Sequence, residues 1–136
     1  KAIYKITSVT ATGGTVSFAS LVNKNAATFN IPATVVIKGV TYSVTAIEKN
    51  AFKNCKKLKK VTIGKNVASI GANAFNKCKK LKNIIFKTTK LKKKSVGKNA
   101  FKGIMTKATF KCPKKVKKSY KTILLKKGAT KKAKFK

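Results

Sequence analysis

A pattern that recurs along the middle of the chain limits the possible folds more than any other feature. One copy covers residues 47–63, and a second covers residues 70–86, 23 positions later. A looser third copy covers residues 96–112, after three extra residues in the segment 87–95. One such unit cannot bury its own apolar side chains, so stacked units must share a continuous core. The repeat therefore predicts a solenoid.

The local structure of one unit follows from its residue types. An Asn precedes an Ala-Phe pair, and Asn is a favoured N-cap, so we expect a short helical turn that buries Phe52, Cys55 and Leu58 on one side. Residues 61–63 and 84–86 then alternate with period two, which predicts short strands that stack into a parallel sheet. The N-cap positions of the three units are Asn50, Asn73 and Asn99.

The third unit departs from this pattern. Lys107 falls where Leu58 and Leu81 lie in the first two units. We expect Met105 or Ile104 to compensate for the missing apolar side chain, or the array to fray into its end at this point.

Cysteines occupy equivalent positions in the first two units. Neighbouring rungs of a solenoid lie about 4.8 Å apart, which would permit a disulfide between Cys55 and Cys78. The preferred interpretation is that both are small buried hydrophobic residues, because Ile104 fills the same position in the third unit. Cys112 occupies a strand position of the core. Scattered cysteines without a Cys-x-x-Cys pair do not predict zinc.

The motif Ile-Gly-x-Asn-Ala-Phe-x-x-Cys-x-x-Leu-x-x-Ile-x-Ile resembles the BspA-like, or treponemal, class of leucine-rich repeat. The resemblance is close over residues 47–86 and looser over residues 96–112. Residues 29–32 and 40–47 resemble the segment that leads into such arrays. The resemblance implies a curved solenoid in a secreted or surface protein of a bacterium, often with an adhesive or host-contact role. The motif specifies the fold far better than the function.

Both ends of the array are expected to be capped. Alternation over residues 3–21, interrupted by Gly13-Gly14, predicts a hairpin with its turn at the glycines, and Lys38-Gly39 predicts a second hairpin. Pro113 suits the first turn of a helix, Gly128 suits its stop, and a last strand is expected near Phe135. The helix would bury Val116, Tyr120, Ile123 and Leu124, which recur at helical spacing.

These elements predict one domain, residues 1–136, of the α/β repeat-solenoid class. Residues 1–46 form a β N-terminal cap with a degenerate repeat, residues 47–112 form three leucine-rich repeats with short parallel strands, and residues 113–136 form a helical C-terminal cap. The chain begins with Lys rather than Met, so we expect a processed product or an excised piece whose targeting segment has been removed.

Composition excludes most enzymes. The chain has 35 basic residues, all lysine, against one acid, Glu48, and its formal net charge is +34. It has no His, Asp or Arg, so general acid–base catalysis and metal sites lack their usual residues. We therefore expect no enzyme activity and no cofactor.

The lysines are the only functional signal. Those of the first unit should stack on those of the second, one rung apart, and like charges that face each other are destabilising. Such ladders suggest a surface for an anionic polymer, although a merely solvated face is the alternative. The candidate polyanion-binding residues are Lys56, Lys57, Lys59, Lys60, Lys79, Lys80, Lys82, Lys92, Lys93, Lys94, Lys114, Lys115, Lys117 and Lys118.

Other partners are disfavoured. Arg, Gln and Asp are absent and the aromatic side chains are needed in the core, so sequence-specific nucleic-acid recognition is not expected. No apolar run approaches 18 residues, and the apolar face of the C-terminal helix is needed to close the solenoid, so membrane insertion is not expected.

The sequence thus predicts a non-enzymatic, basic interaction domain, secreted or on a bacterial cell surface, and monomeric as an isolated domain. Its expected partners are anionic polymers of the cell wall or host glycans, or host surface proteins. Two alternatives remain open: a structural spacer or cap of a larger surface protein, and a non-specific nucleic-acid binder.

Overall fold

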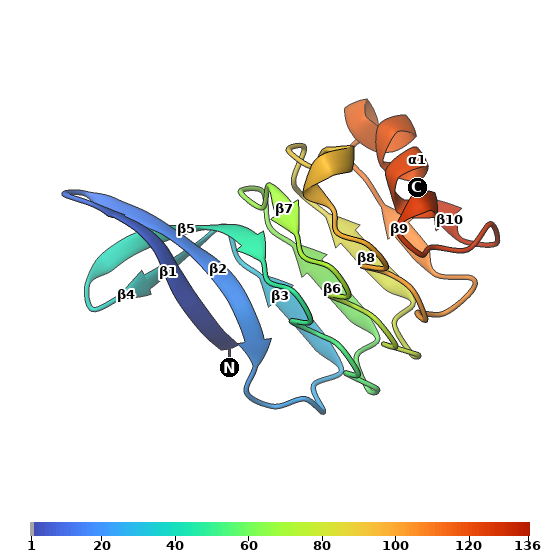
Figure 1. Ribbon diagram of the computed structural model, residues 1–136, viewed down its shortest axis with the longest axis horizontal. Coiled ribbons are helices and arrows are strands. Elements are labelled where there is room, and N and C mark those ends of the chain that lie inside the picture. The colour runs from blue at the N-terminus through green and yellow to red at the C-terminus, as the bar shows by residue number, and fades with distance from the viewer. Residues whose placement is uncertain (1) are drawn as a thin grey trace.

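The computed structural model describes residues 2–136 and consists of two five-stranded sheets and a helix near the C-terminus, which precedes the last strand. The molecule is elongated, with an N-terminal hairpin at one end and the helix at the other (Figure 1). Repeating turns connect the two sheets along the middle of the chain, so the described residues build one continuous array between the two ends.

The N-terminal sheet contains the two predicted hairpins. Strands β1 (Ala2–Thr10) and β2 (Gly13–Leu21) pair antiparallel, as do β4 (Thr34–Ile37) and β5 (Val40–Ile47). Both central residues of the second turn, Lys38 and Gly39, have positive φ (49° and 79°), as a two-residue hairpin loop requires.

The first hairpin turn was predicted at the wrong residues. Ala11 and Thr12 make the turn, and both glycines lie within β2. The absence of a side chain at Gly14 serves close packing instead, because a Cβ there would lie 2.1 Å from the backbone oxygen of Ser8.

The second sheet is parallel and runs through the repeats. Its order is β10-β9-β8-β6-β3, and every neighbouring pair is parallel. A short strand, β7 (Ser69–Ile70), joins β5 in the other sheet. The strands of the parallel sheet are β3 (Thr28–Ile31), β6 (Lys60–Ile63), β8 (Asn83–Phe86), β9 (Thr109–Lys111) and β10 (Lys134–Phe135).

The helical turn predicted at each repeat Asn is wrong. Asn50, Asn73 and Asn99 have φ of 62°, 57° and 58°, in the left-handed region, whereas an N-cap residue is extended. The chain instead forms successive β-turns, in which the N–H of Lys53 bonds to the carbonyl of Asn50 at 3.0 Å and the N–H of Cys55 bonds to that of Phe52 at 3.0 Å.

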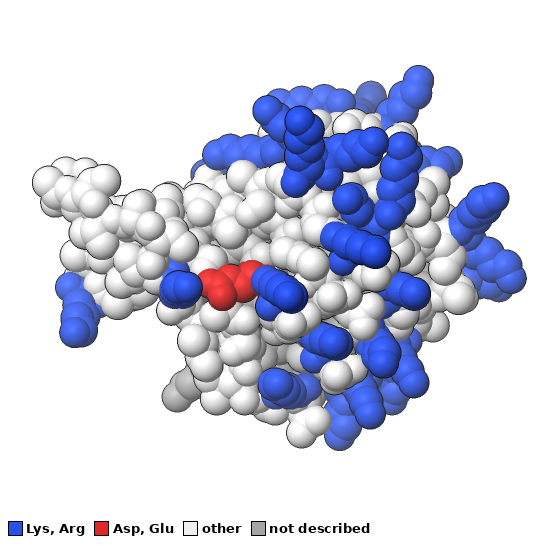
Figure 2. All heavy atoms as spheres, in the orientation of Figure 1, with Lys and Arg blue, Asp and Glu red and all other residues white. Residues whose placement is uncertain are grey.

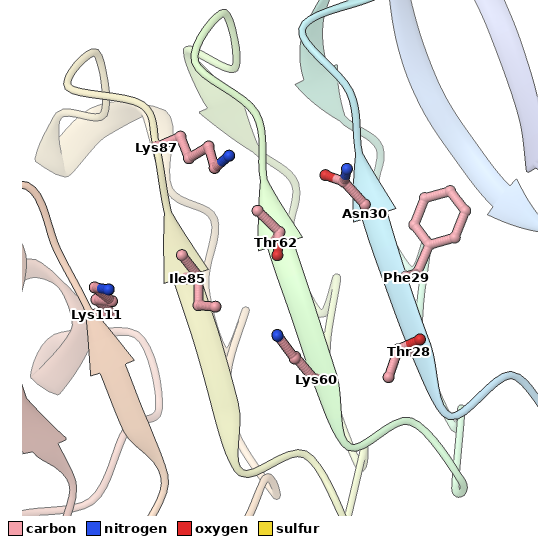
Figure 3. Close-up of a pocket in the computed structure, with 8 residues that line it drawn as sticks. All are labelled: Thr28, Phe29, Asn30, Lys60, Thr62, Ile85, Lys87 and Lys111. Carbon is pink, nitrogen blue, oxygen red and sulfur yellow. The ribbon is translucent and has the colours of Figure 1, made fainter.

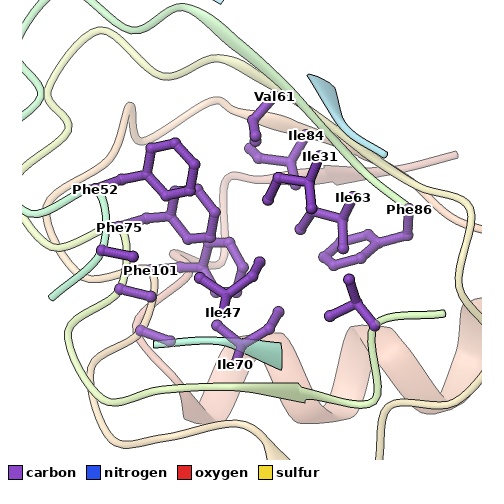
Figure 4. Close-up of a cluster of buried hydrophobic side chains, with 14 of the residues drawn as sticks. Ile31, Ile47, Phe52, Val61, Ile63, Ile70, Phe75, Ile84, Phe86 and Phe101 are labelled. Atoms are coloured by element: carbon purple, nitrogen blue, oxygen red, sulfur yellow. The ribbon is translucent and has the colours of Figure 1, made fainter. Parts of the chain in front are cut away.

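The core lies between the repeating turns and the parallel sheet. The rings of Phe18, Phe52, Phe75 and Phe101 stack in a column, with centroids 4.6, 4.7 and 5.0 Å apart. Figure 4 shows three of these rings across from the inward-facing side chains of the sheet. Residues that are far apart in the sequence thereby form a single buried cluster.

In the third unit, Ala108 supplies the apolar side chain that is missing at Lys107, although it was not predicted to do so. Met105 is 40% exposed and does not compensate for Lys107. Ala108 is fully buried, and its N–H bonds to the carbonyl of Met105 at 3.1 Å, while Ile104 is buried in the position that cysteines occupy in the first two units.

All three cysteines are free and buried, so the preferred interpretation of small hydrophobic residues is confirmed and the alternative disulfide is not formed. The Sγ of Cys78 donates a hydrogen bond of 2.9 Å to the carbonyl of Phe52 in the adjacent rung.

The helix predicted after Pro113 is present. A 3-10 turn, η2 (Lys114–Val116), leads into α1 (Lys117–Lys126), which buries Tyr120, Ile123 and Leu124 as predicted. Val116 was wrongly predicted to be buried in the helix, because it lies in η2 and is only half-buried. Gly128 (φ 113°) stops the helix as predicted, because the N–H of Ala129 bonds back to the carbonyl of Leu124 at 3.1 Å.

Candidate functional site

The outer face of the parallel sheet holds a shallow hollow of about 480 Å³ (Figure 3). Alternation along the strands creates it: Val61 and Ile63 are buried in the core, so Lys60 and Thr62 project from the other face of β6. The parallel register then aligns outward-facing residues of four strands side by side. The hollow is lined by Thr28, Phe29, Asn30, Lys60, Thr62, Ile85, Lys87 and Lys111.

Three ammonium groups define the chemistry of this hollow. Lys60 comes from β6, Lys87 from the residue after β8, and Lys111 from β9, and no acidic residue is among the lining residues. In Figure 3 the side chains of Lys60 and Lys87 extend over the sheet between the strands. Thr and Asn side chains add hydrogen-bonding groups, so the hollow suits an anionic, hydroxyl-bearing ligand.

Only Lys60 of the predicted binding set lies in this hollow. Lys87 and Lys111 were missed, although the sequence contains a signal for Lys111. It follows the buried Phe110, just as Thr62 follows Val61, so alternation places it on the outer face.

A second cluster lies among the turns that precede the strands. Lys59, Lys80 and Lys82 surround Met105 in a hollow of about 250 Å³. The N–H of Lys82 bonds to the carbonyl of Lys59 at 3.0 Å, so these two lysines are neighbours in adjacent rungs, as predicted. Lys60, in contrast, is paired with Asn83 of β8 rather than with another lysine.

The predicted lysines are exposed but do not share one surface. Apart from Lys60, one group precedes the parallel strands in sequence and the other follows them. The two groups therefore lie at opposite ends of the strands. The first group is Lys56, Lys57, Lys59, Lys79, Lys80 and Lys82, and the second is Lys92, Lys93, Lys94, Lys114, Lys115, Lys117 and Lys118.

Charge is strongly biased along the molecule. Figure 2 shows lysines gathered over the repeats and the C-terminal helix, while the projecting N-terminal hairpin carries few. The single acid, Glu48, accepts a hydrogen bond from the Ser17 hydroxyl where the N-terminal sheet meets the first repeat. One acidic side chain against 35 lysines leaves nearly all of the lysines without a carboxylate partner from a side chain of this chain.

The described residues offer little to catalysis. Within residues 2–136, no group of three or more His, Cys, Asp or Glu side chains could hold a metal ion. Burial raises the pKa of the Cys78 thiol to about 12 and that of Cys112 to about 11, and it also raises the pKa of Cys55. These thiols are therefore protonated at neutral pH, when a nucleophilic cysteine would be a thiolate.

A helix long and apolar enough to cross a bilayer does not occur between residues 2 and 136.

Two solved bacterial proteins share the fold. A leucine-rich cell surface protein from Faecalibacterium prausnitzii A2-165 is 25% identical, with a TM-score of 0.57 over 74% of this chain and 33% of its own. A leucine-rich repeat protein from Bacteroides ovatus ATCC 8483 is 26% identical, with a TM-score of 0.55 over 83% of this chain and 34% of its own. The chain thus spans about a third of the length of these proteins. No curated protein matches it.

A family model describes the repeats themselves. The BspA-type leucine-rich repeat region matches residues 20–135 in six copies, so the matched pattern extends beyond residues 47–112 into both segments that were expected to be caps. The motif quoted from the sequence and the stacked rungs of the structure agree with this match. The chain belongs to the BspA-type leucine-rich repeat family.

Proposed function

We propose that this chain is a non-enzymatic interaction domain that holds anionic polymers, such as cell-wall polymers or host glycans, by electrostatic attraction. Host surface proteins with acidic surfaces would be bound by the same lysines. The domain would act as a monomer, without a cofactor, in a protein that is secreted or displayed on a bacterial surface. The Faecalibacterium prausnitzii relative, which is described as a cell surface protein, supports this location.

One observation carries the proposal. The lysines of the repeats are exposed and nearly free of acidic neighbours, and Lys60, Lys87 and Lys111 line the open hollow of the parallel sheet. Like charges held side by side destabilise a folded protein, and an anionic polymer that bridges them would relieve that repulsion. The long hollow across several strands suits an extended ligand that contacts more than one rung.

Two other functions compete with this one. A structural spacer would use the same stacked core and would need the lysines only for solubility. A non-specific nucleic-acid binder would use the same lysines, because duplex DNA is itself a polyanion. Lysine offers a point charge without the planar fork with which Arg reads bases, so loose attraction rather than sequence recognition is expected in either case.

The test is a set of binding titrations against heparin, a teichoic-acid-type polymer and duplex DNA over a series of salt concentrations. We expect tight binding at low salt and a log-linear loss of affinity as salt rises, as counterion release requires. The double variant Lys60→Gln/Lys111→Gln should make the salt slope shallower, by roughly one for each lysine that no longer neutralises an anionic group of the polymer.

A matched control carries the same change of charge far from the hollow. Lys5→Gln/Lys38→Gln removes two exposed lysines of the N-terminal sheet, neither of which lies on a strand that lines the hollow. An equal loss of affinity in both double variants would show that only net charge matters and that the hollow is not a site. Weak binding of all three polymers at low salt would favour the spacer.

A further inference from the structure

A further hollow lies between the C-terminal helix and the segment 87–95, which contains the three extra residues of the repeat. It has a volume of about 390 Å³ and is separate from the outer face of the sheet, with which it shares no lining residue. The proposal above makes no use of it. Its lining consists of Leu91, Lys92, Lys93, Ser119, Thr122, Ile123 and Lys126.

One wall is a stripe of the helix. Ser119, Thr122, Ile123 and Lys126 recur at i, i+3, i+4 and i+7, so they lie along one face of α1. Tyr120 and Leu124 lie on the adjoining face and are buried in the core. In this stripe Ser119, Thr122 and Lys126 are exposed, whereas Ile123 is nearly buried at the bottom of the hollow.

The opposite wall is formed by the segment 87–95, which contains the three extra residues and is called the insertion below. The segment 87–95 leaves β8 and forms a 3-10 turn, η1 (Lys93–Ser95), before the third repeat begins. The N–H of Leu91 donates a hydrogen bond of 3.2 Å to the hydroxyl of Tyr120, which holds this segment against α1. Without the three extra residues, the wall opposite the helix would be shorter.

The floor and the rim differ in chemistry. Leu91 and Ile123 form an apolar floor, and each is only 6% exposed. Lys92, Lys93 and Lys126 form a basic rim, and no acid lines the hollow. Lys118 lies one helical turn before Thr122, so positive charge continues along the helix beyond the hollow.

We propose that this hollow binds an acidic protein segment through one bulky apolar side chain, with flanking carboxylates on the lysine rim. The basic rim fixes the sign of the ligand, because every ionised group that lines the hollow is positive. The floor fixes the size of the apolar part. Since Leu91 and Ile123 are each only 6% exposed, the floor offers apolar surface for one side chain, whereas most of an acyl chain would remain in water.

The experiment compares two labelled peptides, each with six glutamates around a central residue, which is Phe in one and Ser in the other. Their charges are equal, so electrostatics alone binds them equally. We expect the Phe peptide to bind at least about fivefold more tightly, because part of an aromatic side chain is removed from water. The ratio should persist at 0.5 M salt, where the attraction between charges is screened.

The variant Thr122→Trp fills the hollow from an exposed helix position, so the fold should be retained. It should abolish the preference for Phe while leaving heparin binding unchanged. The control Thr34→Trp, at an exposed position of β4, should retain the preference. Backbone amide shifts of the unmodified protein give a second measurement, since the Phe peptide should perturb Leu91, Thr122 and Lys126.

Equal binding of the two peptides would overturn the proposal. It would also fail if the amide shifts clustered around Lys60, Lys87 and Lys111, because the peptide would then behave as another polyanion on the sheet. If the unmodified protein failed to bind heparin but still preferred the Phe peptide, the proposed function would be refuted, whereas the proposal for this hollow would be supported. A fatty acid below its critical micelle concentration could also be added as a competitor of the Phe peptide. If it displaced the Phe peptide at a tenfold lower concentration than the Ser peptide does, the hollow would be assigned to an amphiphile instead.

Discussion

At the scale of single residues, the three thiols behave as apolar groups. Burial is the main cause of the raised pKa of each, and at Cys78 the neighbouring Cys55 adds to it. Lys24 and Lys117 oppose the effect at Cys55 and Cys112 without reversing it. The thiols therefore contribute packing and, at Cys78, a hydrogen bond to the next rung.

This predicts that the folded protein resists thiol reagents. At pH 8, a thiol with a pKa of about 12 is a thiolate in roughly one molecule in ten thousand, and its burial also blocks access. We expect negligible reaction with a chromogenic disulfide reagent over minutes in buffer and reaction of all three thiols in 6 M guanidinium. Rapid reaction of one thiol in buffer would show that its rung opens readily.

The repeat asparagines show where residue type alone was insufficient. Asn is favoured both as an N-cap and in the left-handed region, since its short amide can bond locally in either conformation. The sequence predicted the first of these, and the structure has the second at Asn50, Asn73 and Asn99. The positions four residues later in each unit, Asn54, Lys77 and Gly103, are also left-handed. This second series of residues indicates repeated β-turns, and it was not used in the prediction from the sequence.

At the scale of elements, one side chain joins the helix to the repeats. The Tyr120 hydroxyl donates to the carbonyl of Thr88 at 2.8 Å and accepts from the N–H of Leu91 at 3.2 Å. Thr88 is fully buried, and its hydroxyl donates in turn to the carbonyl of Val67. The helix, the insertion and the preceding turn thus share one buried polar chain.

We predict that Tyr120→Phe lowers the free energy of unfolding by about 1–3 kcal/mol, because it leaves a buried carbonyl and a buried N–H without their partner. Denaturant unfolding measures the loss. Hydrogen exchange should show the Leu91 amide losing protection while the amides of β6 keep theirs. Unchanged protection at Leu91 would mean that the hydroxyl does not hold the insertion in place.

The elements differ in how well the sequence predicts them. Period-two strands such as β6 and β8, and the helix ended by Gly128, depend on neighbouring residues and were predicted. The sheet hollow could have been found by aligning the outward positions of the strands. The hollow beside α1 could not, because its wall depends on a contact between Leu91 and Tyr120, which are distant in sequence.

At the scale of the whole molecule, stability is a balance between a continuous core and a crowded positive surface. Stacked rings connect the rungs from Phe18 to Phe101. Against this, 31 lysines follow Glu48 without one acid. Folding brings these charges closer together than they are in the unfolded chain, so it is opposed by their repulsion.

We therefore predict that the melting midpoint rises between 0.01 M and 0.15 M salt and then flattens, as the Debye length shortens from about 30 Å to about 8 Å. Lys57→Gln/Lys80→Gln should raise the low-salt midpoint and shrink the salt effect. Lys5→Gln/Lys38→Gln, in the sparsely charged N-terminal sheet, should do so much less. Thermal melting by circular dichroism gives both comparisons, and a midpoint independent of salt would contradict the argument.

The uneven placement of lysine also makes the molecule a large electric dipole, with a nearly neutral N-terminal hairpin at one end and most of its charge at the other (Figure 2). Near a negatively charged wall, such a body experiences a torque as well as an attraction. The protein would therefore be oriented before contact, and it would bind with the repeats and α1 facing the negatively charged surface. The β1–β2 hairpin would then point outward, with its turn at Ala11 and Thr12 farthest from the surface (Figure 1).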